Sequence, residues 1–227
     1  MYRDKKITVV IPCYNEEEGI ARVIPTLPTS VDEIIVVDNN STDSTSDVAE
    51  KLGAKVVFEA RKGYGAAYKA GLSAVSGDIV VTMDGDGTYP AEQIEECIDY
   101  LLDNDLDFVS ASRFPLKNPG AMNLSNKIGN TVLTLATLIL FFRGIRDSQS
   151  GMWIFKSSIY DKLSPESNGM PFSEEIKIAA LRHPEIRFDE YNVNYHPRIG
   201  EVKLEKWKDG MRNLLYLVKL RFKPIKR

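Results

Sequence analysis

The segment Ile79-Val80-Val81-Thr82-Met83-Asp84-Gly85-Asp86-Gly87 joins a short apolar run to a polar turn, and this junction decides the fold. The run is short, apolar and rich in β-branched residues, so it predicts a buried strand at residues 79–83. The glycines predict a tight turn, which would place both aspartates at the carboxyl end of that strand. The same junction, a short strand followed by polar or glycine residues, recurs through the first half of the chain.

Strands alternate with helices along the first half of the chain. Apolar strands in such an arrangement predict a parallel sheet covered on both faces, and right-handed crossovers make that sheet doubly wound. We therefore expect a single α/β domain with a Rossmann-like, mainly parallel sheet. The expected strands are 7–12, 34–37, 55–58, 79–83 and 108–112, then 152–156 and 188–194 in the less regular second half. The expected helices are 17–27, 42–52 with Ser41 as N-cap, 65–74, 90–102, 126–142, 173–181 and a long final one.

Composition narrows the functional class. The 227 residues carry a formal net charge of −3, which gives no reason to expect nucleic-acid binding. The two cysteines, Cys13 and Cys97, are expected to be buried, reduced thiols. Residues 1–6 are charged and do not resemble a secretory signal, and no run of about 18 apolar residues is present, so we expect no ordinary membrane-spanning helix. These features favour a cytoplasmic protein, at the membrane face if its substrate is a lipid.

Asp84 and Asp86 form the central candidate site. Two carboxylates two residues apart in a glycine turn can hold a hard divalent cation, and such a cation can grip a diphosphate. A hydrophilic turn without function is the alternative, because Asp-Gly pairs are common in turns. In a parallel sheet, ligands bind beyond the carboxyl ends of the strands, which is where this pair falls. That position favours the functional interpretation.

Two other strand ends carry candidate ligand-binding residues. Asp38 is expected to accept hydrogen bonds from a base or ribose, although capping of the next helix would explain its neighbours Ser41 and Asp43. The turn at residues 61–67 opens a helix with small residues and could meet a phosphate. It is not a dinucleotide fingerprint, because the third glycine is missing and it follows the third strand. No phosphate-binding loop of the G-x-x-x-x-G-K-[ST] type occurs.

Several motifs occur together in one order. They are Ile11-Pro12-Cys13-Tyr14-Asn15-Glu16-Glu17, Val37-Asp38-Asn39-Asn40-Ser41-Thr42-Asp43, Lys62-Gly63-Tyr64-Gly65, Asp84-Gly85-Asp86, Asp147-Ser148-Gln149-Ser150-Gly151, Glu174-Glu175 and Tyr195-His196-Pro197-Arg198-Ile199-Gly200-Glu201-Val202-Lys203-Leu204. In order and spacing the set resembles family 2 glycosyltransferases with the GT-A fold, specifically the dolichyl-phosphate mannose or glucose synthase branch. The resemblance covers nearly the whole chain.

The resemblance implies roles for particular residues. The metal pair is Asp84 and Asp86, with Mg²⁺ or Mn²⁺ as the cofactor, and Asp86 is the more direct ligand. Some family members follow the pair with a glutamine ligand, where this chain has Thr88. The implied donor-binding residues are Pro12, Tyr14, Asn15, Glu16, Asp38, Lys62, Gly63, Asp84 and Gly85. The implied catalytic and acceptor residues are Asp86, Arg113, Arg198, Glu174 and Glu175, with Gln149, Ser150 and Lys203.

The resemblance also implies an activity and an organisation. Residues 1–112 would bind the nucleotide sugar, a UDP-sugar by preference and a GDP-sugar as the alternative, and residues 113–203 would bind the acceptor. With a polyprenyl or dolichyl phosphate acceptor, transfer would invert the anomeric centre without a strong base. With a hydroxyl acceptor, Glu174 or Glu175 would serve as base, unless both are merely first-turn acids of a helix. A soluble-acceptor enzyme and an inactive nucleotide-sugar-binding module remain the alternatives.

Two segments bear on membrane contact. Residues 132–142 are apolar apart from two threonines, which fits either a core helix or an interfacial one. The last 25 residues carry nine Lys or Arg against two acids, with apolar residues at helical spacing. A basic amphipathic helix at 204–227 predicts peripheral attachment to a membrane, and a helix docked on the domain with a solvated basic face is the alternative.

Overall fold

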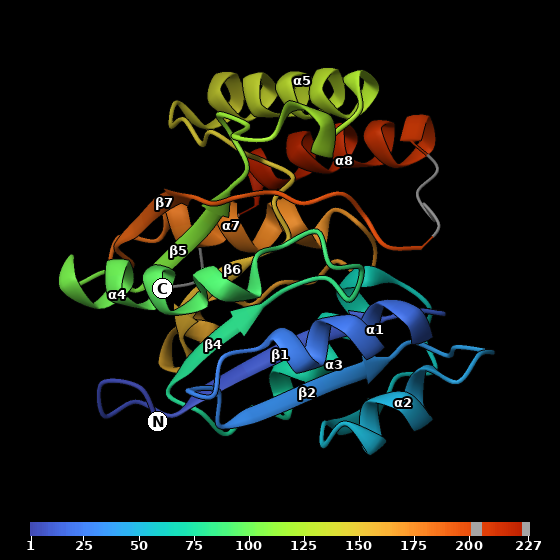
Figure 1. Cartoon of the computed structure of the whole chain (residues 1–227). Helices are drawn as coiled ribbons and strands as arrows, with labels where there is room; N and C mark the ends of the chain where they lie inside the picture. The colour runs from blue at the N-terminus through green and yellow to red at the C-terminus, as the bar shows by residue number, and fades with distance from the viewer. Residues whose placement is uncertain (201–205, 224–227) are drawn as a thin grey trace.

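A seven-stranded sheet forms the centre of the computed structural model, which describes residues 1–200 and 206–223 (Figure 1). The strand order is β3-β2-β1-β4-β6-β5-β7. The strands are β1 (Ile7–Cys13), β2 (Glu33–Asp38), β3 (Lys55–Phe58), β4 (Ile79–Thr82), β5 (Phe108–Ser112), β6 (Trp153–Lys156) and β7 (Phe188–Asn192).

The sheet is mainly parallel, as expected. β1 pairs in parallel with β2 and β4, β2 with β3, and β5 with β7. Only β6 runs antiparallel to its two neighbours, β4 and β5. Carboxyl ends from both halves of the sheet therefore meet at one edge, and the doubly wound α/β class is confirmed.

Helices cover both faces of the sheet. On one face, α1, α2 and α4 pack over a core that includes Ile20, Ala49 and Ile98. On the other, α3 and α7 enclose an aromatic cluster around Tyr68 and Phe172. The helices are α1 (Glu17–Val23), α2 (Thr45–Lys51), α3 (Tyr64–Ser73), α4 (Ile94–Asp103), α5 (Leu124–Phe141), α6 (Tyr160–Leu163), α7 (Phe172–Arg182) and α8 (Lys206–Phe222).

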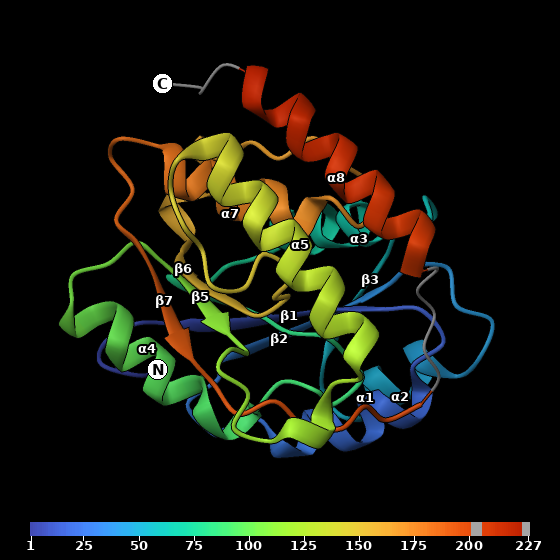
Figure 2. The same ribbon diagram turned by 90° about the horizontal axis from the view of Figure 1, so that it is seen from above.

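A third layer lies outside α7. There α5 and α8 pack against each other and on α7 through the buried residues Leu133, Ile178, Leu217 and Leu220. Seen from above, α5 and α8 lie nearest the viewer, with the sheet behind them (Figure 2). The second half of the chain thus places α5 and α8, together called the roof, over the carboxyl edge of the sheet.

Two local expectations need correction. The second helix begins at Thr45 rather than Thr42, and Ser41 does not cap it. The Ser41 hydroxyl instead accepts the backbone N–H of Asn15, and its own N–H donates to Asp38, so the residue is used within the loop. The first helix ends at Val23, with a 3₁₀ turn over Ile24–Thr26. Cys13 and Cys97 are both buried and are not joined in a disulfide, as expected.

Candidate active site

A pocket of about 290 Å³ lies beyond the carboxyl ends of β4 and β5, beneath the N-terminal halves of α5 and α8. Acidic, basic and aromatic side chains meet in it. Those that concern the chemistry are Asp84, Asp86, Arg113, Arg198, Gln149, Tyr64, Tyr89 and Tyr195, with Asn126, Gly129, Asn130, Asp209, Gly210 and Asn213 from the roof.

The two aspartates after β4 have different surroundings. Asp84 accepts a hydrogen bond from the Tyr64 hydroxyl at 3.1 Å. Asp86 accepts from the backbone N–H and hydroxyl of Thr88 and pairs with the Arg198 guanidinium at 3.0 Å. At Gly85 the turn packs closely on the core, because a Cβ there would lie 3.0 Å from the Cys13 sulfur and 3.3 Å from Ile20. The turn therefore holds both carboxylates at the pocket wall.

The charges of this pair fit a divalent cation. Burial, together with the neighbouring Asp86 carboxylate, raises the pKa of Asp84 to about 7. A bound cation would relieve this repulsion, and carboxylate oxygens are the ligands that Mg²⁺ and Mn²⁺ prefer. Within residues 1–200 and 206–223, no three His, Cys, Asp or Glu side chains form a metal cluster. The other ligands would then have to be water or phosphate oxygens of the donor.

Arg113 is fixed in the pocket wall by a buried ion pair. Its Nε and Nη2 atoms both donate to Asp147 at 2.7 Å, and its guanidinium lies 5.3 Å from the Tyr195 ring centre. Burial alone would lower the Arg113 pKa, but the Asp147 carboxylate outweighs it and raises that pKa well above its ordinary value. A permanent cation of fixed orientation suits a phosphate ligand.

Arg198 reaches the pocket from the segment after β7. That segment lies along the aspartate turn, because the N–H groups of His196 and Ile199 donate to the carbonyls of Thr88 and Asp86. The Arg198 guanidinium lies 3.0 Å from the Asp86 carboxylate and 3.4 Å from Oε1 of Glu16. The structure therefore brings Glu16, Asp86 and Arg198 together from three separate motifs.

The other proposed donor residues lie at the neighbouring strand ends. Asp38 is nearly buried, and its oxygens accept from the Ser41 N–H and the Ser46 hydroxyl. Lys62 lies over the Tyr14 ring and donates to its hydroxyl at 3.0 Å. Asn15 and Gly63 have positive φ, and Pro12 pairs with Val37 inside the sheet. Of this group, none lines the pocket itself, and all lie on the β1–β3 side of the rim.

The proposed acceptor residues are only partly together. Gln149 lines the pocket, donates to Glu174 at 2.5 Å and accepts from Asn213 on α8. Ser150 is buried and donates to the Ala111 carbonyl, so its hydroxyl is used inside the fold. Lys203 lies outside the described residues.

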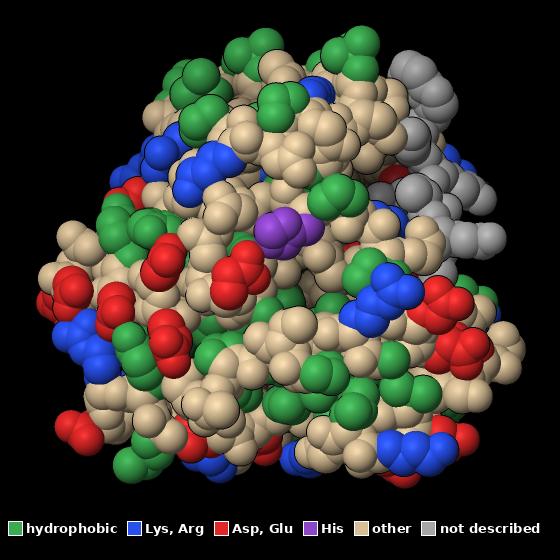
Figure 3. All heavy atoms as spheres, in the orientation of Figure 1, with side chains coloured by type: hydrophobic (Ala, Val, Ile, Leu, Met, Phe, Trp, Pro, Cys, Tyr) green, Lys and Arg blue, Asp and Glu red, His purple; other side chains and the backbone are tan. Residues whose placement is uncertain are grey.

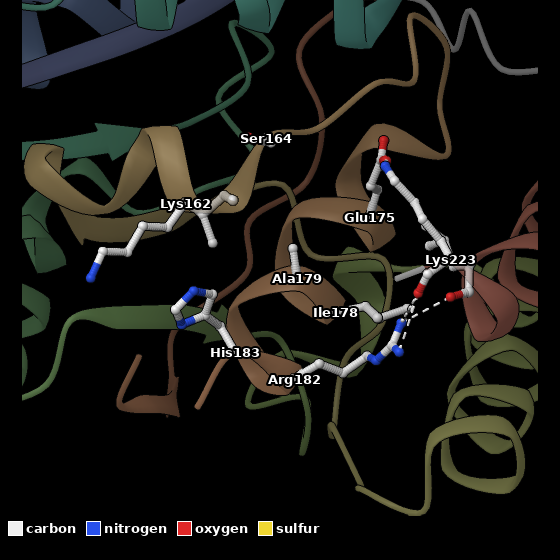
Figure 4. Close-up of a pocket in the computed structure, with 10 residues that line it drawn as sticks. Lys162, Ser164, Glu175, Ile178, Ala179, Arg182, His183 and Lys223 are labelled. Atoms are coloured by element: carbon white, nitrogen blue, oxygen red, sulfur yellow. Dashed lines mark hydrogen bonds and ion pairs between the residues drawn. The ribbon is translucent and has the colours of Figure 1, made fainter. Parts of the chain in front are cut away.

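The two candidate bases are separated. Glu174 is fully buried behind Gln149, and burial raises its pKa to about 8, so near neutral pH it is mostly uncharged. Glu175 points to the other side of α7, into a small pocket of about 50 Å³ (Figure 4). There it pairs with Lys223 at 2.9 Å and accepts two backbone N–H groups.

The arginines outside the site have structural partners. Arg182, in the same small pocket, donates to the carbonyls of Leu220 and Lys223 and so holds the end of α8 (Figure 4). Arg187 pairs with Asp105 and Asp107.

Sequence reasoning missed several groups around the site. Lys177 is fully buried, and its ammonium donates to the carbonyls of Asp147, Ser148 and Ser150, which holds the loop before β6. The Tyr89 hydroxyl accepts the Gly151 N–H of the same loop. Nothing in the local pattern marks a lysine on a helix as buried. Tyr64, however, lies in the Lys62–Gly65 motif, and Tyr89 follows the aspartate pair by three positions, so their places in the sequence could have pointed to both.

Known proteins resemble the chain in sequence and in structure. A family model described as "Glycosyl transferase family 2" matches residues 8–164. The low-salt glycan biosynthesis hexosyltransferase Agl6 of Haloferax volcanii is 34% identical over 93% of this chain, which spans 53% of that protein. A dolichyl-phosphate hexose transferase of the same organism is 30% identical over 92% of this chain and 91% of its own length.

A solved structure shares the fold. Glucosyl-3-phosphoglycerate synthase from Mycobacterium tuberculosis, in complex with Mn²⁺, UDP and glucosyl-3-phosphoglycerate, superposes with a TM-score of 0.75. The match covers 97% of this chain and 81% of that one at 23% identity, so it bears on the fold alone.

Proposed function

The chain belongs to glycosyltransferase family 2 and has the GT-A fold, and on this premise we propose that it moves a sugar from a nucleoside diphosphate to a polyprenyl or dolichyl phosphate. One observation carries the proposal: two carboxylates and two arginines from three separate segments meet in one pocket at the carboxyl edge of the sheet. Relatives named for transfer to dolichyl phosphate support the choice of acceptor.

The acid pair is the donor-phosphate end of the proposed site. Asp84 and Asp86 would hold Mg²⁺ or Mn²⁺, which when bound supplies positive charge for the leaving diphosphate. Arg198 already neutralises Asp86 and lies within reach of Glu16, so it can turn from these carboxylates to a donor phosphate. Asp38, Asn15 and Lys62 on the β1–β3 side would contact the nucleotide, with UDP preferred.

The acceptor phosphate would lie against Arg113. One oxygen of the acceptor phosphate forms the new bond to the anomeric carbon. The bond from that carbon to the diphosphate oxygen breaks, and the nucleoside diphosphate leaves with the electron pair. A single displacement of this kind inverts the anomeric centre. Because a phosphate monoester is already anionic near neutral pH, no base is needed. An uncharged Glu174 and a distant Glu175 agree with such a base-free reaction.

The acceptor also bears on location. A polyprenyl phosphate is held in a bilayer, so we place the working enzyme at the cytoplasmic face of a membrane, in peripheral contact with it. A soluble-acceptor glycosyltransferase of the same fold and an inactive nucleotide-sugar-binding module are the competing interpretations.

Transfer of radiolabelled sugar from UDP- and GDP-sugars into a butanol-extractable lipid tests the proposal. Asp86→Ala should abolish transfer in Mg²⁺ or Mn²⁺ while the variant stays folded in thermal unfolding. Asp99→Ala, which alters an exposed pair with Arg3, is the matched control and should keep activity. Full activity of Asp86→Ala would refute the site. Label that passes only into water-soluble products would refute the lipid acceptor, and nucleotide binding without any transfer would favour the inactive module.

A further inference from the structure

α5 presents an aliphatic face to the outside of the molecule. Only 17% of its 18 residues are buried, and between residues 128 and 142 it carries no charged residue. The exposed residues recur every three or four positions, so they share one face. They are Leu124, Ile128, Val132, Leu135, Leu138, Ile139 and, at the C-cap, Phe142. Figure 3 shows apolar side chains gathered along the upper edge of the molecule, where α5 lies in Figure 1.

α8 adds a second apolar face beside the first. Leu217 and Leu220 dock the helix on its neighbours, while the opposite face exposes large apolar side chains. Exposed bases flank that face, and Asp209, the single acid in the helix, lines the pocket instead. The exposed apolar residues are Met211, Leu215, Val218 and Phe222, and the bases are Lys208, Arg212, Lys219 and Arg221.

We propose that these outer faces of α5 and α8, here called the roof surface, rest on an anionic lipid bilayer. Monomeric soluble proteins rarely expose so many large apolar side chains on adjoining elements, so the surface calls for an apolar partner. The charge of the flanking side chains indicates what kind of apolar partner this is. Bases beside an exposed apolar stripe complement anionic headgroups above an apolar interior. A second copy of the chain would instead bring these bases against one another.

The roof surface lies on the bilayer and does not cross it. By length and composition alone α5 could span a membrane, which differs from the expectation drawn from the sequence. Its inner face, however, is tied to the domain. Leu133 packs in the buried cluster with α8, and the buried Asn130 accepts the backbone N–H of Gln149. A helix held in this way cannot be surrounded by lipid.

This inference rests on the proposed function, and the position of the roof surface would let the lipid acceptor reach the pocket from the bilayer. The pocket lies directly beneath the roof, and Gly129 of α5 and Gly210 of α8 both line it. A Cβ at either glycine would meet no atom within 4 Å, so the two helices leave an opening there. At about 290 Å³ the pocket is at the lower limit for small-molecule sites, which holds a phosphate and a sugar but no long isoprenoid chain. The chain would stay in the bilayer.

Flotation with vesicles tests the inference without any turnover. The full chain should float with vesicles of equal parts phosphatidylglycerol and phosphatidylcholine, and much less with phosphatidylcholine alone. Leu135→Glu should weaken binding by roughly tenfold or more, because it replaces a lipid-buried side chain by a charge. Arg221→Ala and Lys219→Ala should each weaken it by about fivefold on anionic vesicles. Leu52→Glu, at an exposed leucine at the end of α2, is the matched control and should float normally.

The same variants separate this inference from the proposed acceptor. With a short-chain polyprenyl phosphate dissolved in detergent, Leu135→Glu should transfer sugar like the wild type, and with a long-chain acceptor in vesicles it should lose activity. Failure of the wild type to use either acceptor, with flotation intact, would refute the acceptor and leave the roof surface standing. Equal flotation of Leu135→Glu and wild type would overturn the inference. So would a stable dimer in solution that Leu135→Glu dissociates.

Discussion

Asp147→Asn tests whether the buried ion pair with Arg113 holds the site together. Asp147 is fully buried and receives two side-chain hydrogen bonds from Arg113, both 2.7 Å long. The substitution preserves shape but removes the negative charge, and the amide that replaces one oxygen turns donors toward the guanidinium. A buried arginine is then left without its counter-charge. Breaking such a pair costs about 3–5 kcal/mol, which is a large part of the roughly 5–15 kcal/mol that stabilises a domain.

Urea unfolding followed by circular dichroism at neutral pH measures this cost. Asp103→Asn is the matched control, because Asp103 pairs with Arg3 at a similar 2.7 Å but on the surface. It should change the unfolding free energy by at most about 1 kcal/mol. Arg113→Met in the Asp147→Asn background removes the orphaned charge and should recover about 2 kcal/mol or more, although it abolishes transfer. A loss below about 1 kcal/mol for Asp147→Asn, or no recovery in the double variant, would refute the reasoning.

Three further outcomes follow from the site. Tyr64→Phe removes a hydrogen bond that lowers the Asp84 pKa, so the acidic limb of the kcat/KM profile should move up by about one pH unit, and an unmoved limb would contradict the role of Asp84. Burial raises the pKa of Glu174 from its ordinary value of 4.5 to about 8 in the folded protein. The free energy of unfolding should therefore fall as the pH rises from 4.5 to 8. Glu174→Gln should flatten that fall in denaturant titrations at several pH values, and an equally steep fall would show that Glu174 is not the cause. Gly129→Leu should raise the melting temperature, because leucine favours a helix by about 1 kcal/mol over glycine. It should also lower sugar transfer to lipid, because the new side chain narrows the pocket. Unchanged transfer would place the acceptor elsewhere.

The sequence predicts the sheet and the rim of the site well, because both depend on local patterns. The parallel strands β1, β2 and β4 are short apolar runs, and the residue types that follow them mark the carboxyl edge. The acid pair was found in this way and the Arg198 segment through the family resemblance, and the structure brings both into one pocket.

Partners that come from distant segments could not be predicted. Arg113 was assigned to a phosphate, but its pairing with Asp147 joins residues 34 positions apart. The Glu174-Glu175 dipeptide shows the same limit, since adjacent helix positions differ by about 100° in direction. Glu174 is buried behind Gln149, whereas Glu175 enters the small pocket beside Lys223. For α8, the alternative of docking on the domain is found, because Leu217 and Leu220 are buried against Leu133 and Ile178, while attachment to a membrane stays a proposal.

The reversed strand β6 has a consequence for how the two proposed substrates would be brought together. A strand that runs against its neighbours arrives at their carboxyl edge with its first residue, so the chain that precedes β6 is delivered to the place where β4 ends. The Thr82 hydroxyl joins the two by hydrogen bonds with the Gly151 carbonyl and the Trp153 N–H. In the proposed reaction, the loops that would hold the sugar donor and the acceptor are therefore anchored to the same pair of strands, so that no hinge between two domains would be needed to align them.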